Sequence, residues 1–299
     1  KDPLKWTVTA RSIRFAGESG PMGADGLNAS GSLLLPSRDQ ALTVPFQASA
    51  VRAVGLPQET AALLVNPRLS GTVVLANGVT RLDNARLVTT KLDVRGNGQM
   101  QPSGHATASV DASIARFDVP QLGPITGRAV AHIAIVPGRN PAVSGNFEGR
   151  ALGLTNASAA EFLGGNPSMR GNFVLGSNGV IAVSGVNFAS PNLHFTNAAG
   201  SYDPAGGHFT LNANGNSRQY GPVSIVASGT STAPTATIRM PKPDFGFGIT
   251  NLVAEVRPAQ GGGVFVTANG NSPEGDLDAR MIVLFGEGSS FFPFFPLRG

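Results

Sequence analysis

The side chains best suited to chemistry are few in this sequence, and they lie far apart along it. No histidine has a second histidine or a carboxylate at the spacing that tetrahedral metal sites use. The four histidines are His105, His132, His194 and His208. We interpret them as surface or strand-edge residues, so the sequence predicts no metal site.

The most suggestive acids are Asp276 and Asp278, which stand two residues apart on an expected strand and would share one of its faces. Carboxylates at that spacing can bind a cation or act as an acid/base pair. Their setting, PEGDLDAR, is more typical of a turn that leads into a solvated strand. Catalysis at this pair is therefore the minor alternative.

Nucleophile and phosphate-binding motifs are missing from the sequence. No serine stands in a G-x-S-x-G motif, and the chain has no cysteine. The glycines at 261–263 lack the lysine and the strand-to-helix setting of a P-loop. The sequence predicts a protein that is not an enzyme and needs no cofactor.

Composition favours many short strands joined by turns. Of the 299 residues only 13% are charged, 41% are hydrophobic, and there are 39 glycines and 22 prolines. Disordered chains combine low hydrophobicity with high charge, which this chain does not. The net charge is +4, but the basic residues stand singly, so we expect no nucleic-acid partner.

One stretch occurs twice. Residues 66–78 read NPRLSGTVVLANG and residues 166–179 read NPSMRGNFVLGSNG, and each follows a short alanine-rich segment. A repeat of this length indicates stacked units that cannot bury their apolar faces alone. We expect one elongated domain over 1–299, built from repeat units 51–150 and 151–250, as a fragment of a longer chain.

Period-two alternation of apolar and polar residues predicts roughly sixteen strands. Ala106 to Ile114 shows the clearest alternation. Short, turn-rich connections favour antiparallel pairing, and an open sheet of so many strands must curl or fold over. The remaining elements are two short helices, one within 55–66 and one over Ala157–Leu163 that Asn156 caps.

Two local features near the N-terminus are also predicted. The alternation changes phase near Arg11 and Ser12, which indicates a β-bulge. The glycine-rich residues 17–31 are typical of a loop.

The expected apolar face carries many small residues, and two interpretations stay open. Small side chains permit close packing of sheets, which we favour from composition, or they line a cavity for another apolar molecule. The residues concerned are Ala106, Ala108, Ala112, Ala129, Ala131, Gly145 and Gly149.

The segment FFPFFPL, residues 291–297, is poorly suited to a soluble exterior. It is equally consistent with a tail that docks on a membrane or a partner and with a segment that packs on the end of the sheet.

These features together resemble the AsmA-like superfamily of Gram-negative envelope proteins, in particular its TamB-like and YdbH-like branches. The resemblance rests on NP-x-x-x-G-x-x-x-L before an Asn-Gly turn, on the preceding short helix, and on FDVPQLGPITG at 117–127. It covers most of residues 40–285. It implies an all-β fold, an elongated and curled antiparallel sheet folded over an apolar groove like a taco.

The resemblance also implies a function. Such proteins carry phospholipid acyl chains along an apolar β-groove between the inner and outer membranes and support assembly of outer-membrane proteins. The implied location is the periplasm, with an inner-membrane anchor upstream of this chain. The implied partners are phospholipids and an Omp85-type outer-membrane protein.

The groove-lining candidates are the large residues on the clearest apolar alternations. They are Val110, Ile114, Ile133, Ile135, Phe147, Phe173, Leu175, Phe195, Phe209, Leu211, Val264 and Val266. A one-residue slip of strand phase would turn any of them to the other face. The alternative is an extracellular β-solenoid or passenger-type adhesin, a structural protein with a dry core of parallel coils.

Overall fold

The structure is a computed structural model of the chain. The residues that it describes are 2–17, 20–33, 41–56, 58–119, 123–230, 232–244, 248–259 and 263–283. The Phe/Pro segment at 291–297 lies outside the described residues.

The predicted all-β class is confirmed, because most of the described residues lie in antiparallel strands and few lie in helices. The strands belong to one antiparallel sheet, which has 19 strands in the described part of the chain. Two compact units divide the chain, the first made of residues 1–117 and 126–145 and the second of 118–125 and 146–299. The repeat units expected at 51–150 and 151–250 remain a prediction, because these two compact units do not test whether the sequence is duplicated.

The first unit contains the strands from β1 to β8. They are β1 (Leu4–Gly17), β2 (Gly20–Leu33), β3 (Leu42–Ser49), β4 (Arg52–Val54), β5 (Arg68–Ala76), β6 (Val79–Val88), β7 (Leu92–Met100) and β8 (Ala106–Val119). Three strands contribute residues to both units, namely β8 with its last two residues, β9 (Gly123–Ile135) and β10 (Ala142–Ala151).

The second unit contains the remaining strands. They are β11 (Ser168–Leu175), β12 (Ile181–Ala189), β13 (Leu193–Asp203), β14 (His208–Ser217), β15 (Gly221–Thr230), β16 (Pro234–Met240), β17 (Thr250–Pro258), β18 (Val264–Ser272) and β19 (Gly275–Val283).

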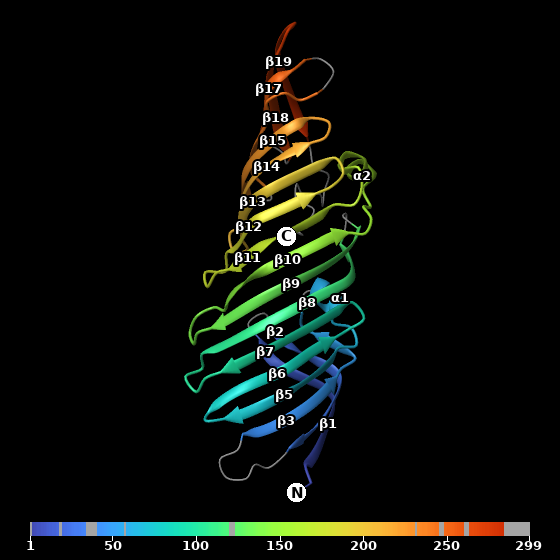
Figure 1. Ribbon diagram of the computed structural model, residues 1–299, viewed down its shortest axis with the longest axis vertical. Helices are drawn as coiled ribbons and strands as arrows, with labels where there is room; N and C mark the ends of the chain where they lie inside the picture. Colours follow the sequence, from blue (N-terminus) through green and yellow to red (C-terminus); the bar gives the residue numbers. More distant parts are fainter. Residues whose placement is uncertain are drawn as a thin grey trace. The chain divides into compact units, whose positions relative to one another are not determined.

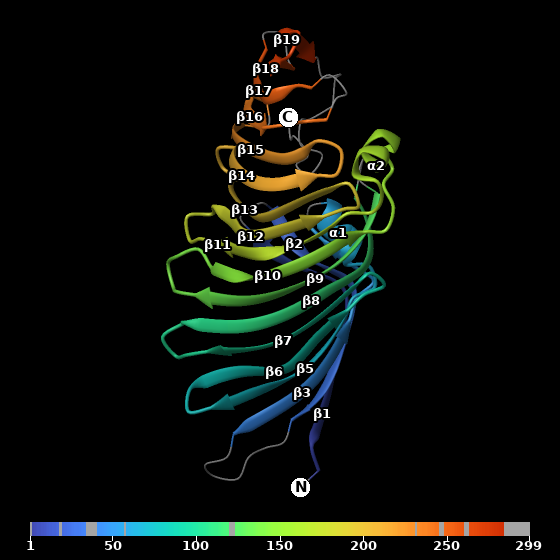
Figure 2. The same ribbon diagram turned by 45° about the horizontal axis from the view of Figure 1, so that its top comes forward.

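Within each unit the sheet is an antiparallel meander, in which strands that follow one another along the chain pair side by side (Figure 1). One variation occurs in the first unit, where β2 pairs with both β3 and β4, and β3 pairs with β5. The strands bend along their length, so the sheet is open and curled within each unit (Figure 2).

The two predicted helices are confirmed as α1 (Gln58–Leu63) and α2 (Ala157–Leu163). The Asn156 side chain accepts a hydrogen bond from the Ala159 amide at 3.0 Å, which is the expected N-cap. Gly164 ends α2 in the left-handed conformation, and its amide donates to the carbonyl oxygens of Ala160 and Glu161. Each helix precedes one copy of the repeated Asn-Pro segment.

Strand register places the alternating apolar residues of the first unit on one side of the sheet. Val44 lies opposite Val73, Val73 opposite Leu82, Leu82 opposite Gly98, and Gly98 opposite Ala108. Directly opposed residues in an antiparallel pair point to the same side. We call this side the apolar face and the other side the polar face.

The apolar face of the second unit follows in the same way. A line of opposed residues runs across seven strands, namely Val183, Gly200, Leu211, Ala227, Ala236, Val256 and Val266. Their neighbours in sequence, such as Ser184, Ser201 and Thr210, point to the polar face. The second unit therefore keeps one side apolar from β12 to β18.

This continuity depends on bulges inside four strands. Each bulge contains a residue in the left-handed conformation, Asn84 (φ 53°), Gly185 (φ 58°), Asn197 (φ 56°) or Asn251 (φ 51°). The register shifts at each of these sites. In β6, for example, the apolar face changes from even positions (Leu82) to odd ones (Ala85), so the extra residue keeps both on the same side.

Two local predictions near the N-terminus are wrong. Residues 20–31 of the expected loop lie in β2, and β1 pairs with β2 without a register shift between Ala10 and Ser12. Glycine has low strand propensity, which is why the sequence indicated a loop. In the structure Gly31 is needed because a Cβ there would lie 2.5 Å from the Trp6 ring. With β2 and the short β4, the described residues hold more strands than the sixteen expected.

The bulge at Asn84 yields a stability prediction. We expect Asn84→Ala to lower the free energy of unfolding by about 1 kcal/mol, because a non-glycine side chain in the left-handed region costs about 1–2 kcal/mol and asparagine tolerates it better. Asn84→Gly should change the stability little, since glycine adopts this conformation freely. Urea unfolding of the three proteins measures the difference, and equal losses for alanine and glycine would contradict the proposed role of the backbone.

Candidate functional site

The structure places the predicted lining residues on the apolar face. Register shows this directly for most of them, which are Val110 and Ile114 on β8, Phe173 and Leu175 on β11, Phe195 on β13, Phe209 and Leu211 on β14, and Val264 and Val266 on β18. Their exposure differs, since Val264 is 2% exposed and the others are half-buried. Their role as a lining for lipid stays a prediction.

The two isoleucines of β9 are placed by their polar neighbours. Arg128 donates to Asp111, and His132 shares a hydrogen bond with Ser109 at 3.0 Å, so both lie on the polar face with these β8 residues. Alternation then turns Ile133 and Ile135 to the apolar face. Ile135 is 41% exposed, near the end of its strand.

Phe147 of β10 is placed by its ring contacts. Its ring centroid lies 6.4 Å from that of Phe173, at an interplanar angle of 49°. It also packs against the buried cluster of Val186, Ala198 and Ala213 in the second unit. Three strands thus contribute small or β-branched residues against the Phe147 ring, which pairs with Phe173 in a tilted arrangement that aromatic pairs favour.

Aromatic rings on the apolar face lie over glycines of the neighbouring strand. A Cβ at Gly171 would come within 2.8 Å of Val186 Cγ2 and 3.3 Å of the Phe147 ring, and a Cβ at Gly71 would come within 3.3 Å of the Phe46 ring. In the same way, the Phe195 ring lies over Gly215 and the Trp6 ring lies over Gly31. These pairs were not predicted from the sequence. The repeat does contain a signal for them, since Gly71 and Gly171 are the glycines that recur in its two copies.

The small residues therefore have a specific use. Glycine and alanine let large rings lie flat along the sheet, so the aliphatic and aromatic groups spread over the face instead of filling a closed interior. Of the two uses expected for the small residues, close packing of one sheet on another is not found among the described residues of either unit. Helices α1 and α2 are the only elements outside the sheet in the described ranges, so within each unit no second sheet packs on this face.

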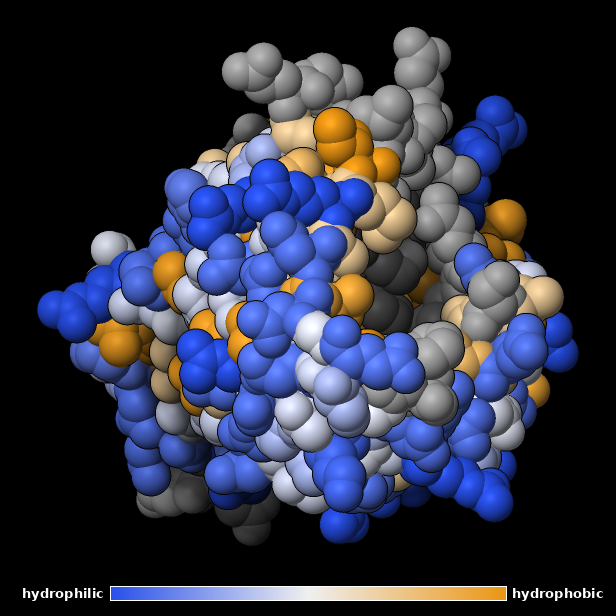
Figure 3. Space-filling view, turned by 90° about the horizontal axis from the view of Figure 1, so that it is seen from above, coloured by the Kyte–Doolittle hydropathy of each residue, from blue (hydrophilic) through white to orange (hydrophobic). Residues whose placement is uncertain are grey.

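The apolar face remains largely uncovered. Ten hydrophobic residues among those described are buried to 9% exposure or less. In the space-filling view, hydrophilic side chains cover most of the visible surface, and hydrophobic ones show in smaller patches between them (Figure 3).

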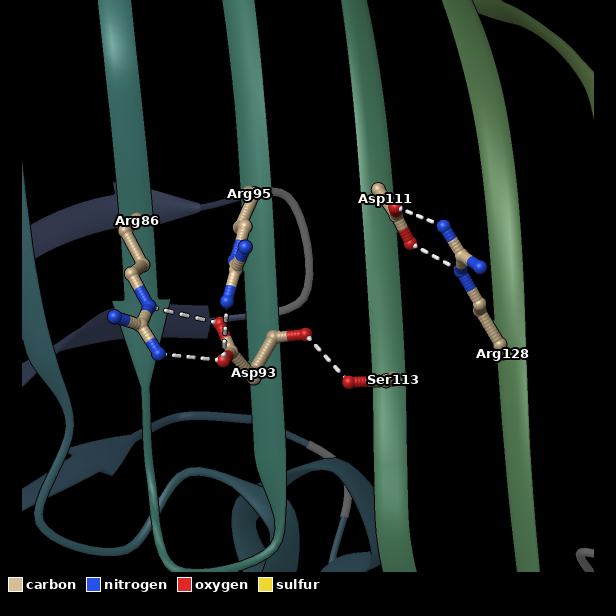
Figure 4. A network of polar contacts seen from close by, with 6 residues as sticks. All are labelled: Arg86, Asp93, Arg95, Asp111, Ser113 and Arg128. Atoms are coloured by element: carbon tan, nitrogen blue, oxygen red, sulfur yellow. Dashed lines mark hydrogen bonds and ion pairs between the residues drawn. The ribbon is translucent and has the colours of Figure 1, made fainter.

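The polar face of the first unit carries a row of ion pairs across β6, β7, β8 and β9 (Figure 4). Arg86 donates two hydrogen bonds to Asp93, at 3.1 and 2.7 Å, and Arg95 lies 3.6 Å from the same carboxylate. Arg128 donates to both oxygens of Asp111, at 2.9 and 2.6 Å. These charges keep the polar face hydrated.

The arginines lower the pKa of the carboxyls that they contact. Hydrogen bonds from Arg86 hold the pKa of Asp93 below its usual value of 3.8, and those from Arg128 do the same for Asp111. The pKa of Arg86 is raised in return. All these groups are exposed, so the effect on stability is small and is screened by salt.

The residues considered for catalysis or metal binding do not come together. No group of three or more potential metal ligands occurs among the described residues. His105 and His132 each share a hydrogen bond with a serine hydroxyl, of Ser103 and Ser109 respectively. Asp278 pairs with Arg280 on β19 at 3.1 Å, and Asp276 accepts from Asn271 at 3.2 Å.

In the described ranges, neither helix has the length and apolar character needed to cross a membrane. Comparisons of the chain with models of known protein families, with curated proteins and with solved structures found no match. The candidate site is therefore defined by geometry alone. It is the apolar face, a surface suited to contact with flexible hydrocarbon and without a convergent set of reactive groups.

The aromatic–glycine pairs predict a graded effect of added methyl groups. We expect Gly171→Ala to lower the free energy of unfolding by about 1–3 kcal/mol, because the new Cβ would overlap Val186. Gly71→Ala should cost less, because its closest contacts are at 3.3 Å. Gly153→Ala is the matched control, since nothing lies within 4 Å of a Cβ there. Chemical denaturation measures all three, and an equal cost for Gly171 and Gly153 would contradict the packing described.

The ion pairs predict a pH-dependent contribution to stability. Because the pKa of Asp93 is lowered on folding, its contribution is present above about pH 3.8 and is lost as the pH falls through the folded-state value. Asp93→Asn should therefore lower Tm at pH 7 and have a smaller effect at pH 2.5. Thermal melts at both pH values, at low and high salt, test this. A deficit that is unchanged by pH would show that lost packing, not charge, is responsible.

Proposed function

We propose that this chain is a non-enzymatic lipid conduit that holds phospholipid acyl chains on its apolar face. The observation that carries the proposal is the continuity of that face from β3 to β8 in the first unit and from β12 to β18 in the second. In the second unit it extends without a phase error from β12 to β18, through three of the bulges. The opposite side of the same strands is hydrophilic, so the two faces suit hydrocarbon and water respectively.

The energetics of acyl chains support this assignment. Removing one CH₂ group from water is worth about 0.8 kcal/mol, so an acyl chain leaves a membrane at high cost unless another apolar surface receives it. A face that is uniformly apolar supplies that surface at each step. If the apolar face has no deep pockets, an acyl chain would not be trapped at one position along it.

The few buried polar side chains of the described residues fit a ligand that has no hydrogen-bonding groups. Ser217 is the one buried polar residue among the described residues, and its hydroxyl accepts a hydrogen bond from the Tyr220 amide at 3.2 Å. The described residues contain no buried side-chain polar atom without a partner. The buried part of this face that the structure describes therefore leaves no polar group that a ligand would have to satisfy, which is consistent with low selectivity among acyl chains.

The cellular setting of the proposal comes from the resemblance to AsmA-like proteins. We propose the periplasm of a Gram-negative cell, with the full-length protein anchored in the inner membrane. An Omp85-type outer-membrane protein is the proposed protein partner, and support of outer-membrane protein assembly is the proposed wider role.

The β-solenoid alternative does not agree with the fold. A solenoid adhesin stacks parallel coils, whereas the strand pairings of both units are antiparallel. The aromatic residues also lie on an uncovered face instead of in a dry closed core. The antiparallel pairing therefore does not support the adhesive function.

Two adjacent residues of β11 allow a sharp test. Phe173 lies on the apolar face, and Val174 lies on the polar face with 49% exposure. We expect Phe173→Asp to reduce phospholipid binding about tenfold or more, because losing the burial of only two CH₂ groups has that effect. Val174→Asp, which adds the same charge one residue away, should bind like the unchanged protein.

The measurement is native mass spectrometry with lipid extraction of protein purified from a Gram-negative periplasm. Circular dichroism and Tm of both variants establish that they are folded. A photo-crosslinking residue at Phe195 should label acyl chains, and one at Asn214, on the polar face, should not. A folded, lipid-free protein, or equal binding by the Phe173 and Val174 variants, would refute the lipid conduit.

A further inference from the structure

The polar face of the first unit contains a hollow that the proposed lipid function does not use. It has a volume of about 610 Å³ and lies over β2, β3, β5 and β6. Its polar side chains are those of Asn28, Ser30, Gln47, Ser49, Arg68, Ser70 and Arg86. A second hollow of about 470 Å³ shares Ser49 and Arg68 with it and adds Asn66, Thr89 and Thr90.

Register explains why these side chains converge. Ser49 lies opposite Arg68 in the β3–β5 pair, and Ser70 lies opposite both Gln47 and Arg86 in its two pairs. Opposed residues share a face, so hydroxyls, an amide and two guanidinium groups meet over adjacent strands. Arg68 and Arg86 are diagonal neighbours across β5 and β6, within reach of one ligand.

The charges at this hollow are not balanced. Arg86 is held by Asp93 in a two-point contact, and its raised pKa keeps it cationic. Arg68 has no ion pair or side-chain hydrogen bond within the described part of the chain. One guanidinium is thus fixed in place and the other is available, which is an arrangement that attracts an anion.

The second copy of the repeat provides an internal comparison. Gly71 corresponds to Gly171 in the repeated segment, so Arg68 corresponds to Ser168 and Ser70 to Arg170. Asn187 lies opposite Arg170 as Arg86 lies opposite Ser70. The same backbone therefore carries serine and asparagine where the hollow has its two arginines. The arginine pair is a property of the first copy and not a requirement of the fold.

We propose that this hollow binds a phosphate ester of a small polyol, with phosphoglycerol as the chemistry that it fits. Arg68 and Arg86 contact the phosphate, and the hydroxyls and amides of Ser30, Gln47, Ser49 and Ser70 hydrogen-bond the polyol. The hollow is large enough for such a molecule, since small-ligand sites are about 300–1,000 Å³. The ligand is either a soluble glycerol phosphate or the headgroup of phosphatidylglycerol at a membrane surface.

Isothermal titration of the folded chain with glycerol 1-phosphate tests the soluble source, with glycerol and inorganic phosphate for comparison. Co-sedimentation with phosphatidylglycerol vesicles tests the headgroup, with phosphatidylcholine vesicles as the reference. We expect saturable binding in at least one arm. Arg68→Ser should weaken it about tenfold or more, because a charge-assisted hydrogen bond is lost.

The matched control is Arg170→Ser, which removes an exposed arginine from the polar face of the corresponding strand in the second copy. It should leave binding unchanged. Ser49→Asp, which places a negative charge in the hollow, should abolish binding without removing an arginine. Equal Tm values for all variants show that they remain folded.

Binding in the titration alone would identify a soluble ligand, and binding to anionic vesicles alone would identify the headgroup; both support the site. No binding in either arm, or equal losses for Arg68→Ser and Arg170→Ser, would overturn it. The outcome is independent of the lipid conduit, because Arg68→Ser leaves the apolar face intact and Phe173→Asp leaves the hollow intact.

Discussion

The constraint on which this structure depends is the phase of side-chain alternation across the antiparallel ladder. Opposed residues share a face, so one extra or missing residue in a strand turns everything beyond it to the other side. The chain meets this constraint with bulges at Asn84, Gly185, Asn197 and Asn251. Each inserts a residue where the apolar sequence pattern itself changes phase, and the apolar face continues past it.

The same constraint determines how the apolar face is packed. A sheet that is not covered by a second layer cannot protect its large side chains by burial from above. Here rings such as Phe46 and Phe147 instead lie down over glycines of the neighbouring strand, which lack a Cβ that would hold them off. The face that results carries its large apolar groups along the sheet, which suits the acyl chains proposed as its ligand.

The two faces of the sheet separate two kinds of recognition. On the apolar face, contact is non-directional and proportional to area, so affinity grows with the length of a hydrocarbon chain. On the polar face of the first unit, the directional donors around Arg68 would select the proposed ligand by charge and geometry. One set of strands can present both because successive side chains of a strand point to opposite sides.

Much of this arrangement could be predicted from the sequence. Alternation at period two fixed the all-β class and the face of residues such as Val110 and Phe173, because that period belongs to the strand itself and needs no partner. Asn156 marked the start of α2 for an equally local reason, since a cap bonds the amide three residues ahead. The repeated glycines were visible as a pattern, but not what they contact.

Other features were decided only by tertiary structure. Whether the glycine-rich residues 20–33 form a loop or a strand depends on the partner strand, because glycine has little preference of its own and β1 supplies the hydrogen bonds and the Trp6 ring. The hollow around Arg68 brings together residues from 28 to 86 through register, which no local pattern encodes. The sequence by itself determined which residues point the same way where its alternation is unbroken, and pairing between strands decided where the bulges lie and which residues meet.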